Sequence, residues 1–454
     1  KLESHAGVGI ELRDATRTCR RGVHALVCEV RHGSIACAHP YGGAPPAMAP
    51  KATLLLCAAV AAVDGWKAPP RKLLKPLATK LLEASLAVGT ISALPADAAP
   101  PQQQHAPSRK YLFVTGFPFP LGPITERRTV KSELVKGKVY GFVQELRLSG
   151  ITANSRCTVF RTKDNDLIVY DPVAPTDEFL QQLASLNGRV THILLGATTY
   201  EHKAFVGPFS RKFPSAKVWA VPDQWAWPLD LAPKALGIFA DGDLIDSASS
   251  ASTYPDDFRE EFEVKLLRPS QRLGLGYAAS EAALYHKPTH TLALTDAIVN
   301  VPAKPTQDYE ADNLRGVGAD AKTDKSLGQL VLALLRLTDF EGGRDIVDAY
   351  WSKPSSSDSL QRGWERNVLL SLFFGPAPQS IVEPHASFSK LPGAWRVAPV
   401  TETLVYKSDR VRPELQRWVD DVSKWDFTYV APAHFEAGKG SPSEWKKAFG
   451  PVLN

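Results

Sequence analysis

Between residues 154 and 202, the order of apolar and polar positions predicts a compact series of strands and one helix. Two short runs rich in β-branched and aromatic residues, Cys157–Arg161 and Leu167–Tyr170, flank four turn-forming polar residues, a pattern typical of a β-hairpin. Asp171 is followed by proline, which cannot continue a β-ladder, so the second strand is predicted to end there.

A helix and a further strand are predicted after the hairpin. Thr176 is a typical N-cap residue, and leucines recur on one face as far as Leu186, which predicts a helix between them. The apolar run Val190–Leu195 predicts a strand that leads into the polar loop Gly196–His202. Because this order is strand, helix, strand, we expect successive strands to lie in one sheet with right-handed crossovers.

The rest of the chain carries similar signals. Short apolar runs predict strands at Phe142–Leu148, Phe262–Leu267, Ala282–His286, Thr291–Thr295, Thr403–Tyr406 and Phe427–Val430, and Phe213–Ala220 predicts a turn followed by a strand. Apolar residues at helical spacing predict helices at Lys203–Arg211, Leu327–Leu337, Ser357–Phe374, Pro413–Val422 and Glu444–Phe449. Tyr111–Tyr140 contains three prolines in its first half and is predicted to be an extended arm.

The first 110 residues differ from the rest in charge. They carry fourteen Lys and Arg against seven Asp and Glu, whereas the remainder carries 39 against 41. The basic excess therefore belongs to this segment, and we expect no nucleic-acid partner. We predict that residues 1–110 are a leader, a targeting sequence and a linker, with 100–109 as the linker, and that 111–454 form the folded domain.

Met48 is the only methionine of the chain, and we expect it to be the initiator. The apolar run Ala52–Val63 is shorter than the roughly 20 residues that span a bilayer, but it suits the core of a signal peptide. A basic segment without acids follows at 66–80, and the combination resembles the bipartite plastid-targeting sequences of algae with complex plastids. This resemblance implies a plastid transit peptide and a location in the stroma or thylakoid lumen. No later apolar run is long enough to cross a membrane, so we expect no transmembrane segment in the mature protein.

The order of the predicted elements resembles the opening of the metallo-β-lactamase fold, in which a strand ends in Asp and a later loop ends in an acid and a histidine. This resemblance implies an α/β fold, a four-layer αββα sandwich in which Asp171 and Asp296 lie at the same end of the two sheets. The helices within about 302–395 would form an inserted helical segment. The chain is similar to a branch of this superfamily in plants, algae and cyanobacteria that is known as a domain of unknown function.

In that superfamily the loop reads His-x-His-x-Asp-His and supplies metal ligands. Counted back from His202, Glu201 stands at the Asp position, and Thr199 and Ala197 stand at the two His positions. The resemblance also places a ligand at Asp296, after a late strand, and at His434, in a terminal Ala-His-Phe.

The ligands of one metal are therefore implied to be Glu201, His202, Asp296 and His434. The other metal would have only Ala197, Thr199 and a loop without histidine near Gln271.

Two classes of function stay open. The leading hypothesis is a plastid protein that has lost the first metal site and serves as a catalytically degenerate binding or assembly module, with a plastid protein as partner. The alternative is a mononuclear metal-dependent hydrolase of an ester, thioester or phosphoester, with Glu201 as a ligand or general base. Two carboxylates and two imidazoles suit one Zn, Fe or Mn ion, or no metal binds. We predict that His192 is a core residue, and that His286 and His290 orient Asp296.

Overall fold

The structure is a computed structural model, and it describes residues 27–31, 34–38, 106–111, 126–148, 151–224, 232–270, 272, 278–318, 359–373, 380 and 383–454. The chain divides into two compact units, Lys1–Pro95 and Ala96–Asn454. In the first unit, β1 (Val27–Arg31) and β2 (Ser34–Ala38) form an antiparallel hairpin. The targeting sequence expected after Met48 and the predicted helix Leu327–Leu337 lie outside the described residues.

The second unit contains a seven-stranded sheet whose strands lie in chain order. Its members are β3 (Val130–Val135), β4 (Val139–Leu148), β5 (Ile151–Arg161), β6 (Asp166–Tyr170), β7 (Arg189–Leu195), β8 (Lys217–Ala220) and β9 (Gly242–Asp243). Strands β3 to β6 pair antiparallel, whereas β6 to β9 pair parallel. The predicted strand–helix–strand unit is therefore confirmed, with α3 (Asp177–Ala184) between β6 and β7 and the Thr176 hydroxyl accepting from the Phe179 N–H.

A second sheet has five strands in the order β10-β11-β12-β15-β16. These are β10 (Phe262–Leu267), β11 (Glu281–His286), β12 (Thr291–Leu294), β15 (Tyr429–Pro432) and β16 (Gly438–Lys439), and a separate pair is formed by β13 (Val299–Asn300) and β14 (Trp395–Arg396). The pairing of β12 with β15 is parallel, although their first residues, Thr291 and Tyr429, are 138 positions apart in the sequence. Both strands therefore deliver the residues that follow them to the same edge of the sheet.

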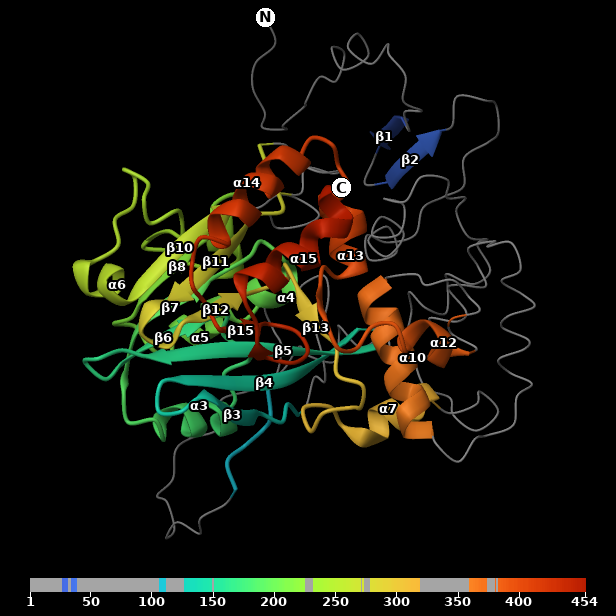
Figure 1. Ribbon diagram of the computed structural model, residues 1–454, viewed down its shortest axis with the longest axis horizontal. Helices are drawn as coiled ribbons and strands as arrows, with labels where there is room; N and C mark the ends of the chain where they lie inside the picture. Colours follow the sequence, from blue (N-terminus) through green and yellow to red (C-terminus); the bar gives the residue numbers. More distant parts are fainter. Residues whose placement is uncertain are drawn as a thin grey trace, which may run out of the picture. The chain divides into compact units, whose positions relative to one another are not determined.

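The two sheets pack face to face and helices cover their outer faces (Figure 1). In β6, Ile168 and Tyr170 point to the second sheet, where they join a core with Leu284 and Ala293. Because side chains alternate along a strand, the intervening Leu167 and Val169 face the opposite way, onto α3 and α5 (Val206–Ser210). On the far side, α14 (Arg412–Val422) and α15 (Pro442–Leu453) bury the rings of Trp418, Trp445 and Phe449 against the five-stranded sheet. Trp425 and Phe427, which lie between the two helices in the chain, belong to the same cluster.

The resulting four layers confirm the predicted αββα sandwich. Asp171 and Asp296 lie at the same end of the two sheets, as predicted, since the Thr295 hydroxyl donates to Asp171 Oδ2 and Asp296 is the next residue in the chain. No helix in the described part of the chain combines the length and apolar character needed to cross a membrane.

The predicted insertion contains α7 (Ala311–Gly318), α10 (Ser359–Phe373) and α12 (Pro384–Phe388), which lie to one side of the sandwich (Figure 1). The helices α7 and α10 cross closely, because a Cβ on Gly363 would lie 1.8 Å from the Leu314 oxygen. The Asn367 side chain of α10 bonds both main-chain groups of Thr152, so the insertion is attached directly to β5. The remaining short helices are α4 (Tyr200–Lys203), α6 (Asp256–Glu261), α13 (Pro399–Thr401), η2 (Pro233–Leu236), η4 (Lys287–Thr289) and η5 (Glu402–Tyr406).

Three predictions of local structure were wrong. The segment Thr403–Tyr406 is helical rather than extended. Its adjacent residues Val405 and Tyr406 are both buried, which a helix allows, whereas a strand would direct them to opposite faces. The predicted arm contains the strand β3, which lies beyond its prolines. Residues Ser108 and Arg109, predicted as linker, instead bond to Glu178 at the start of α3.

Candidate metal centre

The four residues implied as ligands meet at one end of the sandwich. Asp296 follows β12 and His434 follows β15, while Glu201 and His202 lie in α4, after β7. Each offers a ligand atom, and these atoms all lie within 4.8 Å of one another. The structure therefore brings together all four residues, and their role as metal ligands stays a prediction.

The distances between the ring nitrogens and the carboxylate fit a shared metal ion. Asp296 Oδ1 lies 3.1 Å from His434 Nε2 and 3.5 Å from His202 Nε2, and the two Nε2 atoms are 3.2 Å apart. Ligand atoms at 2.0–2.2 Å from one tetrahedral ion are separated by about 3.3–3.6 Å. The side chain of His202 is fully buried, whereas 14% of Asp296 and 15% of His434 are exposed. The centre is therefore closed at its base and open on one side.

A main-chain carbonyl fixes the ring of His434. Its Nδ1 lies 2.6 Å from the Asn154 oxygen. A carbonyl can only accept, so Nδ1 carries the proton and, in the neutral ring, the Nε2 lone pair is free to bind a metal. Arg156, two residues along β5, donates its main-chain N–H to the Ala433 oxygen at 2.7 Å and its guanidinium to the Pro432 and Phe435 oxygens. Strand β5 thus determines the path of the loop that carries His434.

Two side chains hold Asp296. The Thr199 hydroxyl donates to Asp296 Oδ2 at 2.8 Å, which leaves Oδ1 to face the two histidines. The main-chain N–H of Asp296 donates to Glu281 Oε1 at 2.9 Å, and the N–H groups of Thr295 and Ala297 donate to the same oxygen at 3.0 Å. Glu281 therefore sets the turn that presents Asp296. Our sequence reasoning missed Glu281, whose signal was a single acid at the start of an apolar strand.

Below the centre, Asp171 joins the two sheets. Its Oδ1 accepts from the Gly196 N–H and its Oδ2 from the Thr295 hydroxyl, both at 2.7 Å. Gly196 is required at this junction because a Cβ there would lie 2.0 Å from the Tyr170 hydroxyl oxygen. The ends of β6, β7 and β12 are thereby held at fixed distances from one another.

The electrostatics of the centre favour positive charge beside the carboxylates. Burial lowers the pKa of His202, but the carboxylates of Asp296, Asp171 and Glu201 outweigh it and raise that pKa to about 10. Burial raises the pKa of Asp296, but His202 and His434 outweigh it and hold that pKa well below its usual range. A site that attracts a proton this strongly also attracts a metal cation that replaces the proton.

The positions implied for the first metal provide no imidazole. Ala197 is buried and pairs with Glu281 in a β-bridge, and Thr199 is bonded to Asp296. Gln271, the third position, lies outside the described residues.

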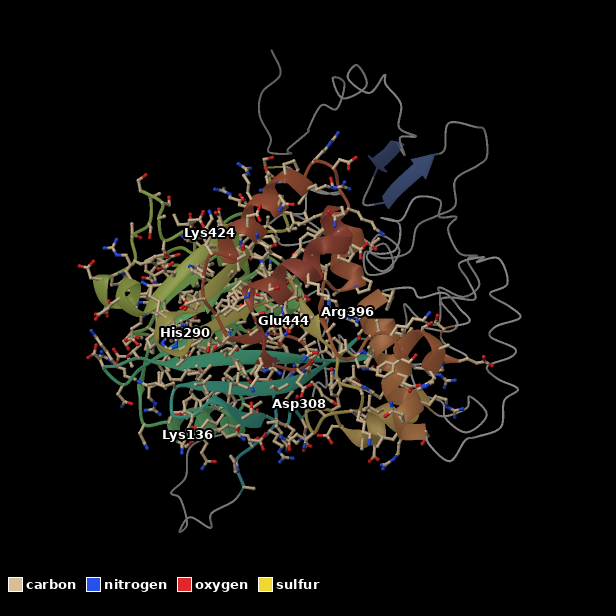
Figure 2. The ribbon with its side chains drawn as sticks, in the orientation of Figure 1. Lys136, His290, Asp308, Arg396, Lys424 and Glu444 are labelled. Carbon is tan, nitrogen blue, oxygen red and sulfur yellow. The ribbon has the colours of Figure 1, made fainter. Side chains whose placement is uncertain are left out.

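The remaining sequence predictions concern three histidines away from the centre. His192 is buried against Trp219 and Phe258, as predicted for a core residue. His286 and His290 do not orient Asp296, because they lie at the opposite end of β12 from it, and the position of His290 is visible in Figure 2. That prediction was wrong because the Lys-Pro-Thr-His turn joins the far ends of β11 and β12.

Comparison with known proteins identifies the family. The family model described as "Domain of unknown function (DUF4336)" matches residues 136–391 and 382–450, so the chain belongs to this family. No curated protein matches the chain. Similar solved structures include a metallo-β-lactamase from Pontibacter korlensis, with 10% identity, coverage of 72% of this chain and 100% of that chain, and a TM-score of 0.32.

Another similar structure is the flavodiiron core of Flv1 from Synechocystis sp. PCC6803, described as metal soaked. It has 9% identity and a TM-score of 0.39, over 72% of this chain and 61% of that chain. The metallo-β-lactamase FIM-1 from Pseudomonas aeruginosa, in its mono-zinc form, has 9% identity and a TM-score of 0.32, over 72% of this chain and 93% of that chain.

Proposed function

We propose that the protein binds one divalent metal ion through Glu201, His202, Asp296 and His434, and that it hydrolyses an ester, thioester or phosphoester. The convergence of the four ligand atoms within 4.8 Å supports this proposal. Two imidazoles and two carboxylates are a donor set that suits Zn, Fe or Mn. The mononuclear hydrolase, which was the alternative from the sequence, thus becomes the preferred hypothesis.

One ion per chain, rather than two, is supported by Thr199 and Ala197. An Asp that bridges two metals through its two oxygens binds one metal with each of them, but the Thr199 hydroxyl bonds Asp296 Oδ2. Ala197 offers a methyl group in place of an imidazole. We therefore propose that the first metal site of the superfamily has been lost from this chain.

A metal ion at this centre would act as a Lewis acid, lowering the pKa of water and polarising a carbonyl or phosphoryl oxygen. His202 and His434 would bind through Nε2, and Thr199 would keep Asp296 from rotating. Glu201 lies beside them and is partly exposed. It is either the fourth ligand or the general base that accepts a proton from an attacking water.

Metal analysis of protein purified without chelators tests this proposal. We expect one ion per chain and activity in a panel of esterase, thioesterase and phosphodiesterase substrates. Glu201→Gln would retain the metal and lose activity if Glu201 is the base, and would lose both if it is a ligand. Protein that contains no metal and takes up none in a titration with Zn, Fe or Mn would overturn the proposal.

A second candidate function is a catalytically degenerate binding or assembly module in the plastid. It is supported by the absence of histidine at positions 197 and 199, and by the basic, apolar leader. This candidate predicts no turnover in the substrate panel and co-purification with a plastid protein. N-terminal sequencing of native protein should then find a start between about Gly65 and Ser108, the range expected after removal of a targeting sequence.

A further inference from the structure

We infer that Tyr309, which precedes α7 in the helical insertion, is a positioning residue for the metal ligand His434. The inference rests on the proposed single-metal site, because it concerns the orientation of one of its ligands. It assigns the insertion a role in building the centre.

Asn154 makes hydrogen bonds with two consecutive residues of the loop after β15, His434 and Phe435. Its main-chain oxygen accepts from His434 Nδ1, as described above. Its side-chain Oδ1 accepts from the Phe435 N–H at 2.8 Å, and its Nδ2 donates to the Phe435 oxygen at 3.3 Å. Phe435 has a φ of 58°, a left-handed conformation that a residue with a side chain seldom adopts without support. Asn154 thus holds both the imidazole of His434 and the strained residue after it.

Tyr309 in turn makes two hydrogen bonds with Asn154. The Tyr309 hydroxyl donates to Asn154 Oδ1 at 3.0 Å and accepts from the Asn154 N–H at 3.3 Å. Asn154 is 1% exposed and Tyr309 is 5% exposed, so water cannot readily replace these bonds. The hydroxyl therefore fixes both the side chain and the main chain of the residue that orients His434.

Tyr309 is supported by the helical insertion. Its ring packs edge-on against Trp364 of α10, with centroids 4.9 Å apart, and Trp364 also meets the ring of Phe435 at 6.1 Å. The Trp364 indole donates to the Pro302 oxygen at 3.0 Å, which fixes its own orientation. The insertion consequently contacts the ligand loop twice, through Phe435 directly and through Asn154.

The variant Tyr309→Phe separates the hydroxyl from the ring, because it keeps the packing against Trp364. The matched control is Tyr254→Phe. Tyr254 is 2% exposed, and its hydroxyl also makes two hydrogen bonds with a single residue. It donates to the Ile245 oxygen and accepts from the Ile245 N–H, both at 2.7 Å. Tyr254 packs on Phe258 and Trp219, in a different core from the His434 loop. Each variant removes a buried hydroxyl that makes two hydrogen bonds, but only the Tyr309 hydroxyl bonds a residue that contacts a candidate ligand.

The first measurement is the affinity of metal-free protein for Zn²⁺, in competition with a chromophoric chelator. We expect Tyr309→Phe to bind about tenfold more weakly than the wild type, the lower end of the effect of residues that orient metal ligands. We expect Tyr254→Phe to bind Zn²⁺ as tightly as the wild type does. Its loss of thermal stability should be comparable to that of Tyr309→Phe. Equal affinities for the two variants would overturn the inference.

The second measurement needs no metal and separates this inference from the proposed function. Hydrogen exchange of metal-free protein reports on the Phe435 amide, which donates to Asn154 Oδ1. We expect Tyr309→Phe to speed exchange in the peptide that contains His434 and Phe435, and Tyr254→Phe to leave it unchanged. If the wild type binds no metal, the proposed function fails while faster exchange still supports the positioning role. Unchanged exchange in Tyr309→Phe overturns that role.

Discussion

The two ends of the sandwich both contain buried histidines, but in opposite electrostatic surroundings. At one end His202 and His434 face Asp296 across 3.1–3.5 Å. At the other end the rings of His192 and His286 pack against aromatic side chains. His286 lies between Phe160 and Phe262, with ring centroids at 5.1 and 4.7 Å.

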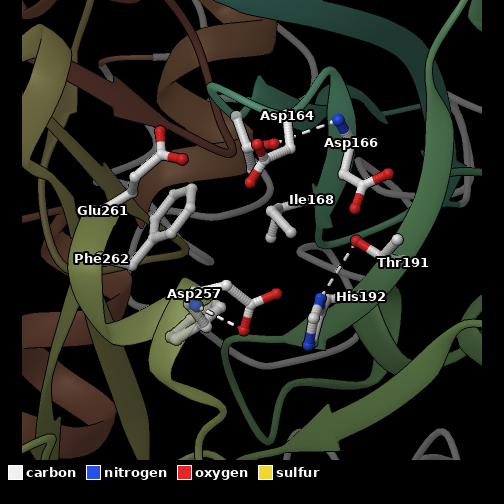
Figure 3. Close-up of a pocket in the computed structure, with 10 residues that line it drawn as sticks. Asp164, Asp166, Ile168, Thr191, His192, Asp257, Glu261 and Phe262 are labelled. Carbon is white, nitrogen blue, oxygen red and sulfur yellow. Dashed lines mark hydrogen bonds between the residues drawn. The ribbon is translucent and has the colours of Figure 1, made fainter.

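The pKa shifts of these histidines have opposite signs. Burial lowers the pKa of His286 to about 3, despite a Glu261 oxygen 3.6 Å from its Nε2. Burial also lowers the pKa of His192, which lies in a cleft beside Thr191 and across from Asp257 (Figure 3). At the end that contains the candidate metal centre, carboxylates raise the pKa of His202 to about 10 even though burial opposes them. Burial alone therefore does not make a histidine a candidate ligand, whereas carboxylates at neighbouring strand ends do.

The largest expected difference between the two ends is in metal binding. His434→Ala removes one of four ligands and the group that Asn154 orients, so we expect affinity for a single metal to fall by more than about 100-fold. His192→Ala removes a ring of similar burial at the other end and should leave one ion per chain. Metal content and Zn²⁺ titration of both variants measure this difference. Retention of the metal by His434→Ala, or its loss from His192→Ala, would contradict the comparison.

Much of the fold could be predicted because burial on one face leaves a periodic record in the sequence. The strands β6, β7 and β10 and the helix α3 were predicted to within a few residues for this reason. The four candidate ligands could be predicted because each follows a strand that the family resemblance identifies. In both cases the information is local, within a few residues of the position predicted.

The partners of the ligands could not be predicted, because only the fold brings them together. Asn154 and Tyr309 are 155 residues apart, and Asn154 in a strand has the pattern of a solvent-facing polar residue. Glu281, at the start of β11, likewise has the sequence pattern of a solvent-facing polar residue. In the segment Thr403–Tyr406, local residue preference itself gives the wrong prediction. Its β-branched and aromatic residues favour a strand, but packing against the core makes it helical.

A pH titration of stability sharpens the comparison at the end away from the centre. The pKa of His286 in the folded protein is below the value of about 6.5 in an unfolded chain. As the pH falls below 6.5, His286 therefore becomes protonated in the unfolded chain but not in the folded protein. The free energy of unfolding, which is highest above this pH, decreases progressively as a result. Between pH 7.5 and 5.0 this loss amounts to about 2 kcal/mol, which His286→Phe should remove.

Urea unfolding of metal-free wild type and His286→Phe at the two pH values measures this effect. The variant is expected to be less stable at pH 7.5, because it loses the bond of His286 Nδ1 with the Thr289 hydroxyl. The test is therefore the difference between the two pH values in each protein, not the stability at either one. The same decrease in both proteins would show that His286 does not remain neutral in the folded state.

The smallest expected effect comes from two adjacent threonines at the centre. Thr199 donates its hydroxyl to Asp296 Oδ2 at 2.8 Å, whereas Thr198 donates to the Ala278 oxygen at 2.5 Å and touches no candidate ligand. Thr199→Val keeps the shape of the side chain but frees Asp296 to rotate, so we expect Zn²⁺ affinity to fall by about tenfold. Thr198→Val also loses a buried hydroxyl bond, and it should lower stability by about 1 kcal/mol with unchanged Zn²⁺ affinity. Thr199→Ser, which keeps the hydroxyl, should restore binding. If Thr198→Val weakens binding as much as Thr199→Val, the effect arises from general loosening of the loop. The bond to Asp296 would then have no separate role.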